Sequence, residues 1–467
     1  MVFMIFRNLF KTILIVSLIL ASASVAFAAP ITNMRSSVSP ARVRFVLDSE
    51  QPVDYKVEQT GKKLVIQLPK SSTKQMNVAI KDNIVRSAQL VPTGRNSSQL
   101  TINMLKDCQY KIAQYIEPNR LVIDVYRIEL LKQEKVLAKG VTYTYIQDEM
   151  NGMQIQACLL SVAPKAKFEL RPFSAAGAYN GRGLLSREAT RRKLLAAVNA
   201  SYFDRDGWVI GVTKDKGNFM SMDSTPRSAY VDDGKSRSIV KDVACNGVLR
   251  FNGGELAIKG MNRARIAEDV VLFNEYYGKS TKTNQWGREI KIRNGKVIEV
   301  SNKGNMTIES GTVVVSAHGL ANKYLLRSIA VGDEVKLIQE LNVPAANEAS
   351  IVVGGGPLIL EDGKVNVRSK EEQIAKDIAI GRAPRTAIGL KKDGTVLVLV
   401  VDGRSTDSKG LTLQELATYF LRLGARDAVN LDGGGSSEMV INGEIVNKPS
   451  DGRERPVSMA LGLFPKY

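Results

Sequence analysis

The chain has 467 residues, more than one ordinary hydrophobic core organises, which predicts roughly two to three domains. Hydrophobic residues make up 44% and charged residues 24%, a composition that excludes an intrinsically disordered chain. The net charge of +18 favours anionic surroundings such as phosphate-bearing glycans, peptidoglycan or a membrane surface, although the basic residues are scattered rather than grouped.

Residues 1–28 have the pattern of a signal peptide. Arg7 and Lys11 precede an apolar run that ends in Ala26-Phe27-Ala28, an A-x-A cleavage signal. An uncleaved N-terminal anchor is the alternative, but the run is short for a full span. We expect export to the periplasm, cell wall or extracellular space, with no transmembrane segment after cleavage and no nucleic-acid partner. The charge then falls to +16 (18 − 2), since Arg7 and Lys11 are the signal's only charged residues.

Residues 30–130 are predicted to form a small all-β sandwich. ARVRFVLDS alternates, with Val43, Phe45 and Leu47 on one face, and KKLVIQLP, SQLTINML and RLVIDVYRI repeat the pattern between turn residues. The pieces VRFVLDSEQPVDYKV, LVIQLP and NRLVIDV resemble an AMIN domain. This resemblance implies targeting to the envelope, through peptidoglycan or another cell-wall polymer; a sandwich without a ligand is the alternative.

The polar segment 131–140 is predicted to be a linker, and 141–467 a second domain of the α+β class with mixed sheets. One helix is expected at SREATRRKLL, with Ser186 as its N-cap. The other is LTLQELATYFLRLG, where Thr412 and Glu415 form a capping box and Gly424 ends the helix.

A long β-rich section, residues 240–345, lies between these helices. It contains an Asn-Gly hairpin signal in REIKIRNGKVIEVS. The three cysteines, Cys108, Cys158 and Cys245, do not form a disulfide framework. A bond between Cys158 and Cys245 and separate buried thiols both remain open.

Four loops share one design, in which an apolar strand is followed by small and polar residues. They are found in AAVNASYFDRDG, IVVGGGPLILEDGKV, PRTAIGLKKDGTVLVLVVDGRS and NLDGGGSSEMVINGEIV. Each alone is compatible with a structural turn, but together they supply carboxylates, arginines and exposed N–H groups at strand ends. The candidate site residues are Asn199, Gly355, Gly356, Arg385, Thr386, Asp402, Arg404, Asp432, Gly434, Gly435, Ser436 and Ser437.

These residue types favour carboxylate chemistry on a phosphate-bearing substrate. One arginine side chain can donate two parallel hydrogen bonds to two oxygens of a phosphate. Glycine lets backbone N–H groups converge on an anion. The only histidine is His318, and GGGSS lacks the nucleophile-elbow pattern, so a Ser-His-Asp triad is not predicted. A P-loop is excluded because no Lys-Ser/Thr follows the glycines, and structural zinc has no Cys/His set. Asp402 and Asp432 are the first carboxylate candidates, because both follow strongly apolar strands.

From residue 142 to 464 the chain resembles the phosphodiester glycosidases, the family that includes the lysosomal uncovering enzyme. The resemblance rests on five ordered blocks: AAVNASYFD, VVGGGPLILEDGKV, PRTAIGLKKDGTVLVLVVDGRS, GLTLQELATYFLRLGARDAVNLDGGGSSEMVINGEIVN and RERPVSMALGLF. One departure is that Ala200 follows Asn199 where the family commonly has glycine.

The resemblance implies a hydrolase that removes a sugar joined through its anomeric carbon to a phosphodiester, in an envelope or exopolysaccharide glycan. It implies phosphate contact by Arg385 and Arg404 and acid, base or nucleophile roles for Asp402 and Asp432. No cofactor is required; a divalent cation near Asp204 or Asp432 is compatible with the carboxylates, but the spacing does not demand one. The alternatives are a non-catalytic glycan-binding protein and a phosphodiesterase that breaks the P–O bond.

Overall fold

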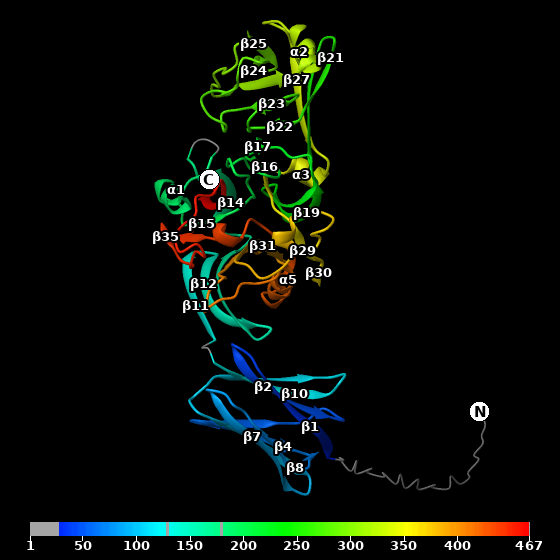
Figure 1. The fold of residues 1–467 in the computed structure, drawn as a ribbon, viewed down its shortest axis with the longest axis vertical. Coiled ribbons are helices and arrows are strands. Elements are labelled where there is room, and N and C mark those ends of the chain that lie inside the picture. Colours follow the sequence, from blue (N-terminus) through cyan, green and yellow to red (C-terminus); the bar gives the residue numbers. More distant parts are fainter. Residues whose placement is uncertain (1–27, 128–129, 178–180, 467) are drawn as a thin grey trace, which may run out of the picture. The chain divides into compact units, whose positions relative to one another are not determined.

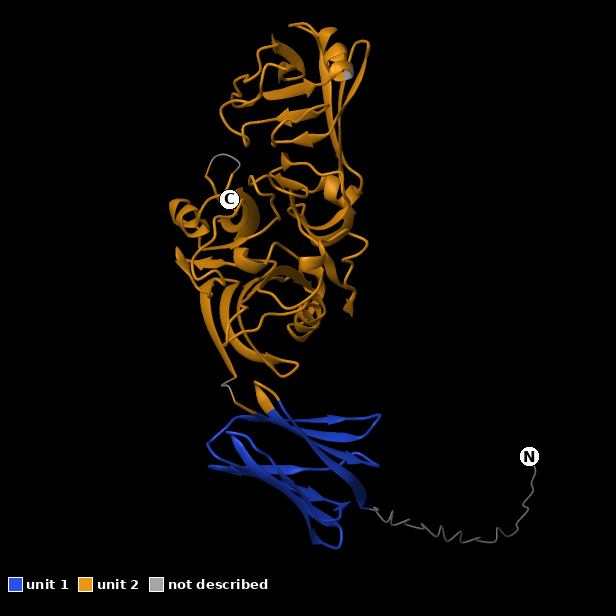
Figure 2. Cartoon of the chain, in the orientation of Figure 1, with its two compact units in different colours: residues 1–38, 43–125 blue, residues 39–42, 126–467 orange. Residues whose placement is uncertain are grey.

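The computed structural model describes residues 28–127, 130–177 and 181–466, so the predicted signal peptide lies outside the described residues except for Ala28. Strands dominate and the helices are few and short, which confirms a β-rich chain with several sheets but leaves less helix than an α+β class suggests. The chain divides into two compact units (Figure 2). Unit 1 comprises Met1–Val38 and Val43–Val125, and unit 2 comprises Ser39–Arg42 and Tyr126–Tyr467.

Unit 1 is built on two five-stranded sheets, in the orders β5-β1-β2-β10-β9 and β3-β4-β8-β7-β6. Val43, Phe45 and Leu47 are fully buried in one hydrophobic core with side chains from both sheets. The predicted alternation of β2 is therefore confirmed. The strands are β1 (Ala29–Val38), β2 (Arg42–Ser49), β3 (Lys56–Thr60), β4 (Lys63–Pro69), β5 (Ser71–Ser72), β6 (Met76–Ala79), β7 (Val85–Gly94), β8 (Ser97–Met104), β9 (Tyr110–Tyr115) and β10 (Arg120–Tyr126).

Unit 2 is organised around an eight-stranded sheet in the order β11-β12-β13-β32-β31-β33-β29-β30. Its central strand β32 is apolar throughout because both faces are covered: Val398 and Val400 belong to one core, Leu397 and Leu399 to another. The strands are β11 (Leu131–Ala138), β12 (Val141–Met150), β13 (Met153–Val162), β29 (Leu358–Glu361), β30 (Lys364–Val365), β31 (Arg385–Lys391), β32 (Val396–Val401) and β33 (Ala425–Asn430).

The part of unit 2 that holds the strand-end loops contains two further five-stranded sheets, in the orders β14-β36-β15-β34-β35 and β17-β16-β28-β18-β19. Their strands are β14 (Phe168–Ser174), β15 (Ala196–Asn199), β16 (Thr213–Asp215), β17 (Asn218–Ser221), β18 (Arg227–Asp232), β19 (Arg237–Val243), β28 (Ile351–Gly354), β34 (Met439–Ile441), β35 (Glu444–Ile445) and β36 (Met459–Pro465).

Residues 245–341 form what we call the inserted module, which lies in sequence between β19 and β28. It contains the sheets β21-β20-β27 and β22-β23-β26-β24-β25 (Figure 1). The strands are β20 (Cys245–Phe251), β21 (Gly254–Ile258), β22 (Gly260–Met261), β23 (Val270–Phe273), β24 (Gly287–Arg293), β25 (Lys296–Ser301), β26 (Val313–His318) and β27 (Val335–Leu341).

The helices are α1 (Leu185–Arg191), α2 (Leu320–Arg327), α3 (Pro344–Glu348), α4 (Lys376–Ala379) and α5 (Leu413–Arg422), with a 3-10 turn at Gly434–Ser436. The capping box of Thr412 and Glu415 is present in α5, and Gly424 has a φ of 84° just beyond its end, so both predictions are confirmed. Helix α5 lies beside β29 (Figure 1). No helix in the described ranges has the length and apolar character needed to cross a membrane.

The structure corrects the predicted linker and the predicted N-cap, and it decides between the two alternatives for the cysteines. Segment 131–140, predicted as a linker, contains β11, because its backbone pairs with β12 despite polar side chains. Ser186 is not the N-cap of α1: Leu184 occupies that position, and the Ser186 N–H and hydroxyl bind Glu454 instead. Cys158 and Cys245 are separate buried thiols in different cores.

Candidate active site

The site lies where β31, a central strand of the eight-stranded sheet, begins and where its neighbours β32 and β33 end. We call this place the site edge, and it is formed by strand ends rather than by an outer strand. Strands β32 and β33 both pair antiparallel with β31, so they run parallel to each other and end at the same edge. Arg385 begins β31 at that edge, Asp402 directly follows β32, and Asp432 follows β33 by two residues. The topology thus brings the third and fourth predicted loops together.

Asn199, at the end of β15, joins this edge to the first loop through a buried side-chain amide. Its Nδ2 donates to the Asp432 carbonyl at 2.6 Å, and its Oδ1 accepts from the Glu438 N–H at 3.0 Å and from the Thr386 hydroxyl at 2.7 Å. Asn199 and Thr386 are both buried. One side chain therefore holds both ends of the segment 432–438, which we call the glycine loop.

Each of the three glycines in the glycine loop is required, either by a close approach of another group or by its backbone conformation. Gly433 leaves only 3.0 Å between an ideal Cβ and the Pro384 carbonyl oxygen. Gly434 has a φ of 62° and donates its N–H to the same carbonyl. At Gly435 a Cβ would meet Arg455 Nη2 at 1.9 Å. Side chains at these positions would displace the loop or the arginine.

Two guanidinium groups flank the glycine loop. Arg404 Nη2 lies 3.2 Å from an ideal Cβ on Gly434, and Arg455 covers Gly435. Arg455 is held by Asp451, at 2.6 Å between Nη2 and Oδ2. Arg404 is exposed, adopts a φ of 59°, and makes no hydrogen bond or ion pair with any residue that the structure describes. Its guanidinium is therefore available to an anion beside the loop.

Asp432 is the titratable group of this loop. Burial raises its pKa to about 6, while the Ser436 hydroxyl, the Gly433 N–H and the charge of Arg455 act in the opposite direction. A carboxylate with this pKa is mostly ionised at neutral pH and suits a base or a nucleophile. Because the pKa is raised above the unfolded value, the stability that Asp432 contributes is present at low pH and is lost as the pH rises through about 6.

The second loop closes another side of the site. Gly355 lacks room for a side chain, since an ideal Cβ would lie 2.6 Å from the Asn430 carbonyl oxygen. Tyr202 donates its hydroxyl to the Gly356 carbonyl at 2.8 Å and accepts from Asn430 Nδ2 at 2.7 Å. Burial, and then the charge of Asp432, raise the pKa of Tyr202, which keeps the phenol protonated. Tyr202 is thus a neutral donor close to Asp432.

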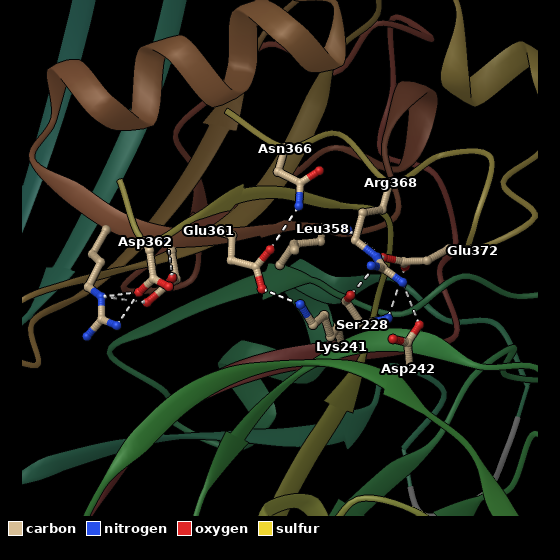
Figure 3. Close-up of polar contacts among 11 residues, drawn as sticks. Ser228, Lys241, Asp242, Leu358, Glu361, Asp362, Asn366, Arg368 and Glu372 are labelled. Carbon is tan, nitrogen blue, oxygen red and sulfur yellow. Dashed lines mark hydrogen bonds and ion pairs between the residues drawn. The ribbon is translucent and has the colours of Figure 1, made fainter. Parts of the chain in front are cut away.

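Glu372 supports this loop from behind. Its carboxylate accepts from the Ser228 N–H and hydroxyl and from the Leu358 N–H, at 2.7 to 3.0 Å (Figure 3). Its Oε2 would lie 2.7 Å from a Cβ on Gly356. Glu372 therefore links β18 to β29 and fixes the turn between β28 and β29.

Arg385 and Arg227 differ in how much of each guanidinium is engaged. Arg385 is buried and donates to the carbonyls of Leu411, Ile378 and Gly381, which leaves two of its five N–H donors. Burial lowers its pKa. Arg227 has a buried Nε that finds no hydrogen-bond acceptor in the described part of the chain, and its charge lowers the pKa of Tyr202.

Asp402 is buried and its carboxylate faces the segment after β35. Oδ1 accepts from Asn447 Nδ2 at 3.1 Å and from the Lys448 N–H at 3.0 Å. Burial raises its pKa, an effect that these two donors oppose. Asn447 also donates to the Ser437 carbonyl, so Asp402 connects indirectly with the glycine loop. In this structure Asp402 anchors the loop, and Asp432 lies within it.

Glu438, at the end of the glycine loop, forms a carboxyl pair with Glu454. Burial, together with the charge and hydrogen bond of Glu454, raises the pKa of Glu438 to about 9. Glu454 in turn accepts from the Ser186 N–H and hydroxyl at the start of α1. Glu438 therefore holds a proton at neutral pH, whereas Asp432, at the other end of the glycine loop, is mostly ionised.

The remaining predicted residues are distributed as follows. Ser436 lies beside Asp432, and Ser437 has a buried hydroxyl that pairs with no described residue. Asp204 is exposed and caps its own turn by accepting from the N–H groups of Asp206 and Trp208. Among the described residues, no group of three or more His, Cys, Asp or Glu side chains is arranged to hold a metal ion.

Sequence reasoning did not select Tyr202, Arg227, Glu438, Glu454 and Arg455. Tyr202, Glu438, Glu454 and Arg455 stand inside quoted blocks, but only the fold shows which segments they bring together. The Ala200 departure is accommodated: its N–H donates to Met459 and its carbonyl accepts from Asp432, so a buried methyl fits without a glycine.

Parts of the chain are similar in sequence to known proteins. A family model described as phosphodiester glycosidase matches residues 286–464. N-acetylglucosamine-1-phosphodiester alpha-N-acetylglucosaminidase of Bos taurus is 29% identical over 158 residues, which cover 32% of this chain and 30% of the relative. The uncharacterized SPbeta prophage-derived protein YomE of Bacillus subtilis is 47% identical over 80 residues, 17% of this chain and 12% of that protein. The chain thus spans less than a third of either relative.

A solved structure extends the likeness of fold beyond these segments. The crystal structure of a hypothetical protein from Synechocystis has a TM-score of 0.64 at 21% identity, and the match covers 94% of this chain and 81% of that one. At this identity the likeness concerns the fold alone.

The contact between Arg455 and the glycine loop predicts a measurable pKa change. Arg455→Gln removes a positive charge that lowers the pKa of Asp432, so that pKa is expected to rise above about 6. NMR titration of ¹³C-labelled aspartate measures it directly. Arg453→Gln, an exposed arginine two residues away, is the matched control and is expected to leave the titration in place. An unchanged or lowered pKa in Arg455→Gln would contradict the assigned geometry.

Proposed function

We propose that the protein is an exported hydrolase that cleaves the glycosyl C–O bond of a sugar-1-phosphodiester, because residues 286–464 match the family model described as phosphodiester glycosidase. We propose a phosphate-linked glycan of the cell envelope, or an exopolysaccharide, as its substrate. The observation that carries the proposal is the glycine loop, which contains the ionisable Asp432 and has the guanidinium groups of Arg404 and Arg455 against Gly434 and Gly435.

The arginines suit a departing phosphate. In the proposed reaction, the bond between the anomeric carbon and the phosphate oxygen breaks, and its electron pair leaves with the phosphate. Water supplies the new oxygen on the sugar, so the products are a free sugar and a phosphomonoester. Arg404 and Arg455 stabilise the charge that develops on the phosphate oxygens. Arg227 supplies a third cation, whereas Arg385 positions the start of β31 and keeps two N–H groups for the substrate.

The three carboxyl groups have different roles in the proposed reaction. Asp432 acts as nucleophile or as the base that activates water, because it is ionised near neutral pH. A phosphate leaves without strong protonation, so the reaction does not require a second carboxyl at the leaving oxygen. Asp402 and the protonated Glu438 position the two sides of the glycine loop.

The role of Asp432 is tested by Asp432→Asn, which keeps the shape but removes the ionised carboxylate. We expect sugar release from a glycosyl-1-phosphodiester to fall by about 100-fold or more, in line with the loss of an acid–base group. Asp407→Asn, an exposed aspartate paired with Lys448, is the control and is expected to retain activity. If Asp432→Asn keeps full turnover, Asp432 has no catalytic role. If the native protein binds the glycan without any turnover, the chain is a glycan-binding protein instead.

For residues 30–130 we propose binding to peptidoglycan or another cell-wall polymer. The support is the AMIN-like strand pattern together with the separate hydrophobic core of unit 1. Deleting residues 30–130 is expected to lower the amount of protein that sediments with purified cell wall, while turnover of a small soluble substrate persists. Unchanged sedimentation would contradict the proposal, and loss of turnover would show that this segment also supports the catalytic unit.

A further inference from the structure

The inserted module contains an open cavity of about 660 Å³ that none of the site loops reaches. It lies where the end of β20, the turn between β24 and β25 and the start of β27 meet. Its volume falls within the range of about 300–1,000 Å³ typical of ligand sites. The lining residues are Arg250, Phe251, Asn294, Gly295, Lys296, Glu334, Val335 and Lys336.

One wall of the cavity is a tight turn that is fixed in place. Asn294 and Gly295 have φ values of 50° and 74°, as a two-residue hairpin turn requires, so the Asn-Gly prediction is confirmed. The Gly295 carbonyl accepts from the Val335 N–H at 2.8 Å, and a Cβ on Gly295 would lie 3.3 Å from the Val335 carbonyl oxygen. The turn therefore holds a constant position against β27.

The charges on the lining are unbalanced. Arg250 and Lys336 are direct cross-strand partners in β20 and β27, an arrangement of like charges that destabilises a sheet. Neither Lys296 nor Lys336 forms an ion pair with any described residue, and Arg250 has only the exposed Glu255, at 3.1 Å. Three cations thus face one lining carboxylate, Glu334. An anion between Arg250 and Lys336 would relieve their repulsion.

The cavity also offers contacts that suit a sugar ring. Phe251 is partly buried and supplies an apolar face, and the side-chain amide of Asn294 supplies a donor and an acceptor. Such a mixture of an aromatic ring, an amide and cations fits a ring that carries hydroxyls and a negative charge.

We propose that this cavity is a second, non-catalytic binding site for an anionic sugar residue of a polysaccharide. The charge that it recognises is a phosphate or a carboxylate, and Arg250, Lys296 and Lys336 make the contacts. The site would keep a polymeric ligand on the module independently of any turnover, so the proposal does not rest on the hydrolase activity.

Isothermal titration of the full chain carrying Asp432→Asn tests the site without turnover. The probes are a poly(glycerol phosphate) oligomer, an oligogalacturonate and an uncharged dextran oligomer. We expect at least one anionic probe to bind and dextran not to bind; the two anionic probes distinguish phosphate from carboxylate. In the same background, Lys296→Gln with Lys336→Gln is expected to weaken binding at least tenfold.

Lys303→Gln removes an exposed charge of the module outside the cavity and serves as the control. It is expected to weaken binding less than twofold. The proposal is overturned if neither anionic probe binds, if dextran binds equally, or if the double variant and the control have the same effect. That last outcome would show attraction to the diffuse positive charge of the chain. Circular dichroism confirms that the variants remain folded.

Discussion

The buried amide of Asn199 is the interaction on which the site depends. It donates to the Asp432 carbonyl and accepts from the Glu438 N–H, so one side chain fixes both ends of the glycine loop. Thr386 fixes the amide in turn, and it does so from β31, the strand between β32 and β33. Loss of the amide would leave several buried polar groups without partners, each at a cost of about 1–3 kcal/mol. This explains why the loop can hold an ionisable carboxylate in one place.

The glycines work together with arginines. Because Gly434 and Gly435 have no side chains, the guanidinium groups of Arg404 and Arg455 can lie directly against the backbone. The same groups that would bind phosphate therefore also shape the electrostatics of Asp432, since Arg455 opposes the rise in its pKa that burial causes. In the proposed reaction, a phosphate bound by Arg455 would therefore influence the ionisation of Asp432.

Sequence patterns predicted the parts of the molecule that obey local rules. The alternation of β2, the capping box of α5 and the turn at Asn294 and Gly295 depend on neighbouring residues, and all are present. Contacts between distant segments were not predictable in this way. Ser186 has the residue type of an N-cap, but Glu454, 268 positions away, binds it within the helix. The pairing of Glu438 with Glu454 likewise has no signal in either local sequence.

In the proposed reaction water attacks the anomeric carbon at the glycine loop, and oxygen-18 labelling distinguishes this from attack at phosphorus. A glycosyl-1-phosphodiester is hydrolysed by the protein in H₂¹⁸O, and mass spectrometry locates the label in the products. We expect the label in the hydroxyl of the released sugar, because the C–O bond breaks. Label in the phosphate would contradict C–O cleavage and would identify a phosphodiesterase that breaks the P–O bond.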